Sequence, residues 1–182
     1  RRKGLLHLFE KLQIEKANIN EDDIGFSVAP CINVASRMEH AAISYALLTT
    51  ESEEEADALS RKLIEKNTER KKLTDEIFKQ IDLDIDGTKL PDVLVFGDSK
   101  WPVGILAPLA NKFLEKYSRS VFLWSGGDDG DIKGSCRSDG SINLVDFMAE
   151  IGDKIIIISC VYYGLICWGF FLDAIGLGLL YQ

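Results

Sequence analysis

The chain has 182 residues, of which 46% are hydrophobic and 27% are charged, a balance that is typical of a folded globular protein and too apolar for a disordered one. The formal net charge of −8 excludes a protein that coats nucleic acid through general positive charge, because such binding needs many Lys and Arg side chains. Any phosphate site must therefore be local. The four cysteines form no CxxC pair and there are two histidines, so we predict no metal site and expect free thiols in a reducing cytoplasm.

The first part of the chain has the pattern of helices. Apolar residues at helical spacing predict a helix over 4–12. Asn20 as N-cap predicts a second helix over 21–28, which we expect Pro30 to end. A third helical pattern covers 35–49. Because the sequence starts abruptly with RRKGLLHLFEKL, we interpret it as part of a longer protein.

A long helix is predicted next. Ser52 and Glu55 have the spacing of a capping box, and acidic residues fill the first turn, where the helix dipole favours them. The apolar positions are interrupted over EKNTERKK (65–72), and a helix that is apolar at both ends often bridges two bodies. We therefore predict a linker helix over 52–82, between a helical piece (1–51) and a second domain (83–182).

Strands and helices alternate after this helix. The predicted strands cover 91–98, 120–126 and 131–138, and the predicted helices cover 104–118 and a segment that opens at Ser141. This order predicts an α/β fold in which a small mixed sheet with covering helices follows the helices and the linker helix. Within KGSCRS (133–138), alternation along the strand should place Lys133, Ser135 and Arg137 on one face.

Two segments have a second interpretation. The sequence DLDIDG (82–87) opens like a calcium-binding loop, but Val93 stands where the loop needs a bidentate Glu, so we expect a solvated turn. The uncharged run over 155–172 is long enough for a membrane-spanning helix, although its residue types also form buried strands. The residue types alone leave both possibilities open.

Several phrases give the sequence a family likeness. IGFSVAPCINVASRM (24–38), with Asn67 and Arg70 in the long helix, is similar to the IGFxxAPRINxAxRM and NxxR phrases of the RecJ-like single-stranded-DNA exonucleases, which belong to the DHH phosphoesterase superfamily. Trp101 and Gly104 resemble a WxxG element of that family, and KGSCRS matches its KGSxRS element at every fixed position. The resemblance covers about residues 4–153.

The resemblance implies that two domains have different functions. An amino-terminal DHH domain would hold two divalent metals, Mn²⁺ or Mg²⁺, and hydrolyse the phosphodiester with water. A DHH-associated domain would bind the DNA strand. The DHH motif is absent from this sequence, so we expect 1–51 to be the helical end of the catalytic domain, 52–82 the linker helix and 83–182 the DHH-associated domain. On this interpretation the chain has no catalytic residue, metal ligand or cofactor of its own.

The same resemblance implies the site residues. The KGSxRS element would bind substrate phosphate, with Arg137 as a charged fork on its oxygens and Ser135, Lys133 and Ser138 beside it. The alternative is a strand whose arginine pairs with a neighbouring aspartate. Asn33 and Arg37 would add contacts to the DNA backbone, although Arg37, near a helix start, could equally fasten the two domains together.

The sequence also departs from the family. Cys31 stands where the family has Arg, which puts a phosphate or carboxylate contact in doubt. After Asp153 the expected glycine-glycine-histidine loop is missing, and the tail over 155–182 is unusually apolar. A frameshift over about 155–168 would explain both features. Translation of the parent DNA in the other two frames would test that hypothesis.

The resulting interpretation is the nucleic-acid-binding part of a 5′-to-3′ single-stranded-DNA exonuclease of DNA repair or recombination. We expect it to act in the cytoplasm, away from the membrane, with single-stranded DNA and the missing DHH domain as partners. Three alternatives remain open at this stage: a non-catalytic module that binds nucleic acid or another phosphorylated ligand, a fragment of a DHH-type oligonucleotide or cyclic-dinucleotide phosphodiesterase, and a membrane-anchored interaction domain.

Overall fold

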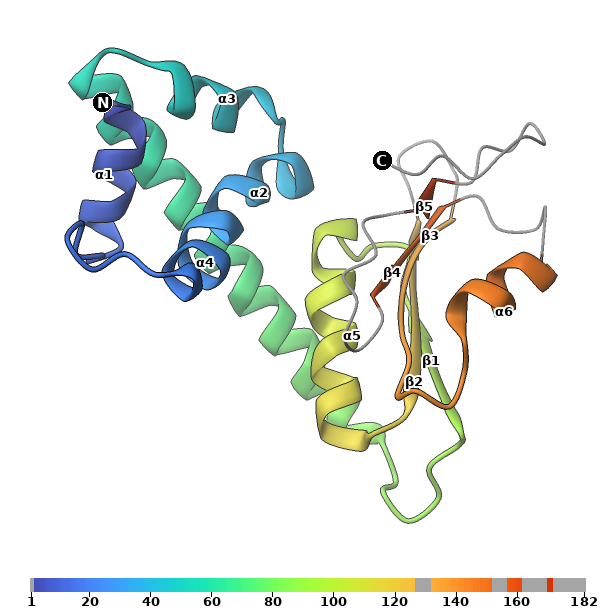
Figure 1. Ribbon diagram of the computed structural model, residues 1–182. Coiled ribbons are helices and arrows are strands. Elements are labelled where there is room, and N and C mark those ends of the chain that lie inside the picture. Colours follow the sequence, from blue (N-terminus) through green and yellow to red (C-terminus); the bar gives the residue numbers. More distant parts are fainter. Residues whose placement is uncertain (1, 127–131, 152–156, 162–169, 172–182) are drawn as a thin grey trace. The chain divides into compact units, whose positions relative to one another are not determined.

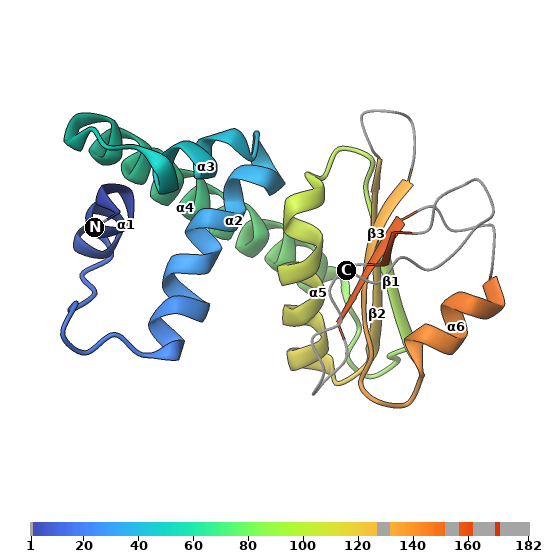
Figure 2. The same cartoon turned by 45° about the horizontal axis from the view of Figure 1, so that its top comes forward.

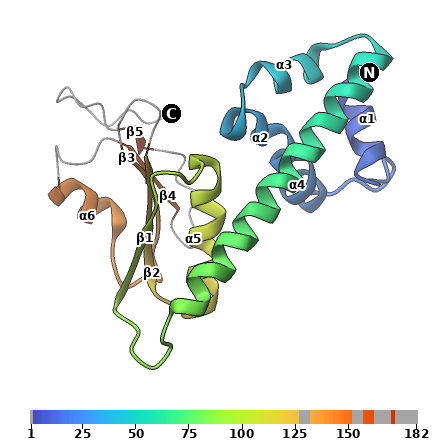
Figure 3. The ribbon, with the colours of Figure 1, turned by 180° about the vertical axis from the view of Figure 1, so that it is seen from behind.

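The predicted long helix is present and unbroken. In the computed structural model, which describes residues 2–126, 132–151, 157–161 and 170–171, α4 runs from Glu53 to Asp84 over 32 residues (Figure 3). The Ser52 Oγ caps it by accepting a hydrogen bond of 3.2 Å from the Glu55 amide. The chain divides into two compact units, Arg1–Leu73 and Thr74–Gln182. Because the division falls within α4, this helix contributes residues to both cores.

The first unit is entirely helical in its described part. Three helices and a π-helical turn surround the first part of α4 (Figure 1); they are α1 (Lys3–Lys11), η1 (Asp23–Val28), α2 (Ala29–Met38) and α3 (Ala42–Thr49). Their core includes Leu8, Val34, Leu47 and Leu63, each at most 1% exposed. A methyl group on Gly4 would lie 1.7 Å from the Leu47 carbonyl oxygen. Only glycine therefore allows α1 to approach α3 so closely.

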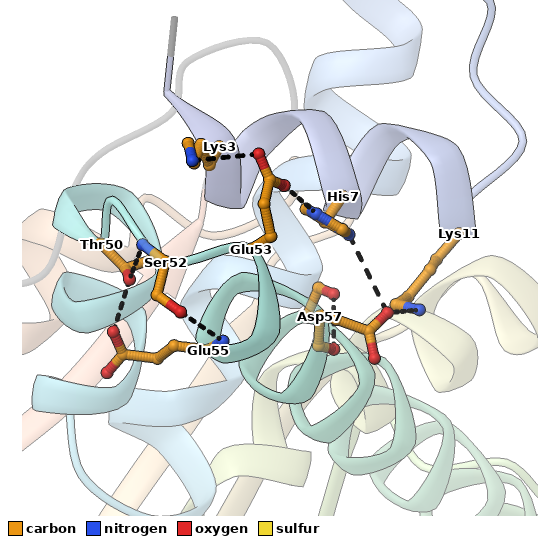
Figure 4. Close-up of polar contacts among 9 residues, drawn as sticks. Lys3, His7, Lys11, Thr50, Ser52, Glu53, Glu55 and Asp57 are labelled. Carbon is orange, nitrogen blue, oxygen red and sulfur yellow. Dashed lines mark hydrogen bonds and ion pairs between the residues drawn. The ribbon is translucent and has the colours of Figure 1, made fainter.

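Charged side chains hold α1 against the first turns of α4 (Figure 4). Glu53 accepts from Lys3 at 3.1 Å and pairs with His7 Nε2 at 2.7 Å. Lys11 Nζ lies 2.5 Å from Asp57 Oδ1. These contacts hold the pKa of both carboxyl groups below their ordinary values, mainly through His7 for Glu53 and through Lys11 for Asp57. The two helices are thus joined by polar contacts as well as by the core.

Two helix boundaries in this unit were predicted wrongly. The Asn20 cap is present, since its Oδ1 accepts from the Asp23 amide at 2.9 Å. Pro30, however, does not end the helix: η1 continues directly into α2, and Pro30 lies in the first turn of α2, where a missing N–H is tolerated. The helix predicted over 35–49 is interrupted after Met38. His40 Nδ1 accepts from the Ala42 amide at 3.2 Å and so starts α3 as a separate helix.

The second unit has the predicted mixed α/β architecture. Its elements after α4 are β1 (Val93–Gly97), α5 (Val103–Tyr117), β2 (Ser120–Gly126), β3 (Ile132–Arg137), α6 (Leu144–Ile151), β4 (Ile157–Val161) and β5 (Phe170–Phe171). The strands lie in the order β1-β2-β3-β4-β5. The β1/β2 and β3/β4 pairs are parallel, and the β2/β3 and β4/β5 pairs are antiparallel. The sheet is therefore mixed.

Helices cover both faces of this sheet (Figure 2). On one face, Phe113 of α5 packs against Phe96 of β1 with ring centroids 5.1 Å apart. On the other face, Phe147 of α6 packs against Phe122 of β2 at 5.4 Å. The sequence predicted that α6 opens at Ser141, but its cap is Asn143, whose Oδ1 accepts from the Val145 amide at 3.0 Å. The face that carries α5 is the one that matters for the site.

The apolar tail is described only in part. The residues of β4 and β5 belong to it and form strands. In the part of the chain that the structure describes, no helix combines the length and the apolar character that membrane crossing requires. The remainder of 155–182, on which the frameshift hypothesis falls, lies outside the described residues, as does the acidic loop at 127–131.

Candidate phosphate-binding site

The KGSCRS strand is the central strand β3, between β2 and β4. In its antiparallel register with β2, Arg137 lies opposite Val121 and Ser135 opposite Leu123. Val121 and Leu123 are buried, at 0% and 2% exposure, and Arg137 bonds a residue of α5. Alternation therefore turns Ser135 and Arg137, with Lys133 before them, to the α5 face of the sheet, as the sequence predicted.

The Arg137 side chain is buried, at 4% exposure. Its Nε donates a hydrogen bond of 2.5 Å to Asn111 Oδ1 of α5. Its Nη1 donates to the Cys136 carbonyl oxygen at 2.6 Å and to Ser135 Oγ at 3.2 Å. Burying a charge is costly unless hydrogen bonds replace its water, and these neutral acceptors supply such bonds. The guanidinium is thus held in place by hydrogen bonds from both α5 and β3.

The other residues of the element differ in their surroundings. Lys133 is half-buried and lies opposite Ser125 near the start of β3. Ser138 is 2% exposed, and its Oγ donates to the Ile142 carbonyl oxygen at 2.7 Å while accepting from the Gly140 amide at 3.0 Å. The hydroxyl of Ser138 therefore closes the turn after β3. Of the predicted residues, the structure brings Arg137 and Ser135 into direct contact.

The sequence also allows an arginine that pairs with a neighbouring aspartate. Asp139 is the described aspartate closest in sequence to Arg137, and it bonds elsewhere. Its Oδ1 accepts from Ser120 Oγ at 2.9 Å and from the Ser141 amide at 3.0 Å. Contacts with Ser141 lower the pKa of Asp139, with a smaller contribution from Ser120. Asp139 thus stabilises the turn that follows β3.

The two remaining predicted residues belong to the first unit. Asn33 and Arg37 are exposed on α2. Arg37 lies in the last turn of α2, not near a helix start as the sequence suggested. The pKa of Arg70 on α4 is lowered, first by burial and then by the positive charge of Arg37. Two positive charges therefore lie near each other in this unit.

The two family phrases of the first unit meet at Cys31. Its thiol is 1% exposed and accepts a hydrogen bond of 3.5 Å from Asn67 Nδ2. Asn67 Oδ1 in turn accepts from Arg70 Nη2 at 3.0 Å. Burial raises the pKa of the Cys31 thiol, and the Asn67 contact opposes that rise. The APCIN phrase and the NxxR phrase thus form one hydrogen-bonded chain across α2 and α4.

The carboxylates near the calcium-like sequence serve other purposes. Asp82 lies inside α4 and binds Lys116 and Tyr117 of α5. Asp86 accepts from the Thr88 amide at 2.9 Å in a local turn. Among the residues that the structure describes, no group of three or more His, Cys, Asp or Glu side chains could hold a metal ion. The described carboxylates therefore offer no ligand set for Mn²⁺ or Mg²⁺.

Asn111 is the residue of this site that the sequence did not single out. It lies on an exposed position of α5, yet its side chain reaches the buried Arg137. Its position directly after the apolar run VGILAPLA of α5 was a weak signal. Spacing alone could not pair it with a residue 26 positions later.

Comparisons with known proteins define the class of the second unit. The DHHA1 domain family matches residues 90–155, a range that includes the β1-α5-β2 unit and the KGSCRS strand. This part of the chain is a DHHA1 domain.

Similarity to whole proteins extends further along the chain. The chain is 30% identical over 162 residues to the single-stranded-DNA-specific exonuclease RecJ of Bacillus subtilis, a match that covers 84% of this chain and 20% of that protein. It is 27% identical over 157 residues to RecJ of Escherichia coli, covering 82% of this chain and 27% of that protein. The chain therefore spans 20% and 27% of the length of these two relatives.

Solved structures agree with this relationship. RecJ from Thermus thermophilus in complex with Mg²⁺ matches with a TM-score of 0.70 and 26% identity, over 85% of this chain and 24% of that one. An exonuclease RecJ bound to manganese matches with a TM-score of 0.64 and 28% identity, over 80% of this chain and 35% of that one. Over the residues that align, the chain is similar to RecJ, and its residues 90–155 match the DHHA1 domain family.

Proposed function

We propose that this chain is the nucleic-acid-binding part of a RecJ-like 5′-to-3′ single-stranded-DNA exonuclease that serves DNA repair or recombination in the cytoplasm. Residues 1–51 form the helical end of a DHH catalytic domain, 52–82 the linker helix and 83–182 the substrate-binding DHHA1 domain. The partners are single-stranded DNA and an amino-terminal DHH domain. The two metals of the reaction, Mn²⁺ or Mg²⁺, belong to that domain, so the chain by itself has little or no nuclease activity.

The observation that carries the proposal is the buried guanidinium of Arg137 on β3. A guanidinium presents several N–H donors in a plane and stays charged at every physiological pH, which suits the oxygens of a phosphate. Neutral acceptors on Asn111, Ser135 and Cys136 hold it. In this proposal the guanidinium contacts a phosphate of the DNA strand, with the Ser135 hydroxyl beside it and Lys133 earlier on the same face.

Asn33 and Arg37 supply a second, weaker set of contacts to the DNA backbone. Both are exposed on α2, and the positive charge of Arg37 near Arg70 favours an anion there. Lys133 and Arg37 thus act as electrostatic contacts, whereas Arg137 is the positioned one. Ser138 supports the element through the turn that its hydroxyl closes.

The proposal is tested by the affinity of the chain for a 5′-phosphorylated single-stranded oligonucleotide, measured by fluorescence anisotropy. Arg137→Ala should weaken binding by about 1.5 to 3 kcal/mol, the scale of a hydrogen bond to a charged group. Arg61→Ala is the matched control, because Arg61 lies exposed on α4 and pairs with Asp57. An Arg137→Ala chain that keeps its circular dichroism spectrum and binds as tightly as the unaltered chain would contradict the proposal.

A further inference from the structure

Trp124 of β2 lies between two glycines of the neighbouring strands. The register places Gly97 of β1 opposite it on one side and Gly134 of β3 opposite it on the other. Gly126, two residues further along β2, belongs to the same face because side chains alternate along a strand. Glycine within a strand often marks a place where another group approaches the backbone closely. The indole therefore lies in a flat region of the sheet, to which these three neighbours add no side chain.

The indole ring lies flat over Gly97. A Cβ atom on Gly97 would lie 2.3 Å from each of Cδ2, Cε2 and Nε1 of Trp124. These three atoms belong to the five-membered ring, and a point so close to all three lies above the ring, not beside its edge. One face of the indole is therefore turned to the backbone of β1. Trp124 is 38% exposed, and this exposure comes mainly from the opposite face and the edges of the ring.

Exposed apolar side chains flank Trp124 on its face of the sheet. This is the face that carries α6, because Phe122, two residues earlier on β2, packs on Phe147. In the register, Val95 lies opposite Phe122, and Ile132 lies opposite Gly126. Val95 and Ile132 therefore share this face, and they are 60% and 62% exposed. The indole thus lies on an accessible, largely uncharged part of the sheet.

We propose that Trp124 is a stacking platform for a base of single-stranded DNA. This inference rests on the proposed function and adds a base contact to the phosphate contact of Arg137. Every nucleobase is planar and has a π-face, so an indole held flat on the backbone can stack on any of the four bases. A neutral base needs no cation, which suits a chain of net charge −8. Because Arg137 and Trp124 lie on opposite faces of the sheet, they contact different nucleotides of the strand.

The first test compares variants by their affinity for a 5′-phosphorylated single-stranded oligonucleotide, measured by fluorescence anisotropy. Trp124→Ala should weaken binding by about tenfold, within the range measured for one stacked base. Trp124→Phe keeps an aromatic face and should bind more tightly than Trp124→Leu, which keeps only apolar bulk. Val95→Ala is the matched control, because it shortens an exposed apolar side chain of the same face, and it should bind like the unaltered chain. Circular dichroism checks that each variant is folded.

The second test uses an abasic oligonucleotide of the same length, in which hydrogen replaces every base. Trp124→Ala should bind it like the unaltered chain, whereas Arg137→Ala should weaken binding to both oligonucleotides. If Trp124→Ala leaves the affinity for the base-bearing strand unchanged, or if Trp124→Leu binds as tightly as Trp124→Phe, the stacking role is overturned. The proposed function still stands in that case, provided that Arg137→Ala weakens binding. If Arg137→Ala and Trp124→Ala both leave the affinity unchanged, both proposals fail.

Discussion

Asp82 and Tyr117 are joined by a hydrogen bond of 2.6 Å, which the Tyr117 hydroxyl donates to Asp82 Oδ1. Lys116 Nζ donates to both oxygens of the same carboxylate, at 2.5 and 2.6 Å. These contacts fasten the last turn of α4 to the last turn of α5. They lower the pKa of Asp82, with Lys116 contributing more than Tyr117. The first aspartate of the calcium-like sequence thus serves helix packing.

Removal of the Tyr117 hydroxyl should weaken this junction. We expect Tyr117→Phe to lower the free energy of unfolding of the second unit by about 1 kcal/mol, the usual net value of one hydrogen bond. The ring itself should remain stacked on Phe113, at 6.2 Å between centroids. Denaturant unfolding measures the change. Tyr45→Phe is the matched control, because Tyr45 is 70% exposed, and an equal loss in both variants would exclude a specific role for the junction.

Acid should destabilise both units. The pKa values of Glu53, Asp57 and Asp82 are lowered, chiefly by His7, Lys11 and Lys116 in that order. A carboxyl whose folded pKa lies below its unfolded pKa contributes fully above the unfolded value and loses that contribution as the pH falls through the folded value. We therefore expect the melting temperature to fall below about pH 4, near the unfolded pKa of Asp and Glu.

The acid prediction is checked by thermal unfolding across pH at constant ionic strength. Asp57→Asn and Asp82→Asn should each make the acid decline shallower, because each removes one carboxyl whose ionisation favours the folded state. A chain that becomes more stable as the pH drops from about 5 to 3 would contradict the sign of these shifts.

Gly4 should tolerate no side chain. A Cβ atom there would lie 1.7 Å from the Leu47 carbonyl oxygen, so Gly4→Ala must push α1 away from α3. The core side chains Leu8 and Leu47, both 0% exposed, would lose contact, and we expect a loss of about 3 kcal/mol in unfolding free energy. Gly25→Ala is the control, since nothing lies within 4 Å of its added methyl. Similar unfolding midpoints for the two variants would refute this explanation.

Restoring the arginine of the family phrase at position 31 should destabilise this chain. Cys31 is 1% exposed, and the positive charges of Lys71 and Arg70 already act on it. An arginine there would add a further buried positive charge, so we expect Cys31→Arg to cost about 3 kcal/mol or more. Cys31→Ser, which adds no charge, should cost about 1 kcal/mol. Thermal unfolding of both variants tests this prediction. A Cys31→Arg chain as stable as the Cys31→Ser chain would contradict it.

The strands and helices of the second unit could be predicted from the sequence because apolar residues recur with a different period in a strand than in a helix. Strand and helix patterns over 91–138 placed β1, α5, β2 and β3 to within a few residues. The helical first unit was harder. A proline can follow the end of one helix or occupy the first turn of the next, and the sequence does not distinguish the two positions. The prediction that Pro30 ends a helix was therefore wrong. The break before α3 depends on a bond from the Ala42 amide to His40, and the apolar pattern does not report such a bond.

The candidate site shows the same limit. Alternation along the strand placed Ser135 and Arg137 on one face without any knowledge of the fold. Whether Arg137 is exposed or buried depends on α5, which covers that face, and its acceptor Asn111 lies 26 positions away in the sequence. Contacts of that kind follow from the packing of a helix on a sheet. Neither residue type nor local spacing encodes them.

The division between the two units falls between Leu73 and Thr74, in the middle of α4. Proteases cut backbone that can adopt an extended form, and a helical segment must first unwind to do so. Limited digestion should therefore spare this boundary. An excised DHHA1 domain that starts at Val93 would also lack Phe78, whose ring packs on Phe113 at 4.8 Å. Any separately expressed second unit should include the last turns of α4.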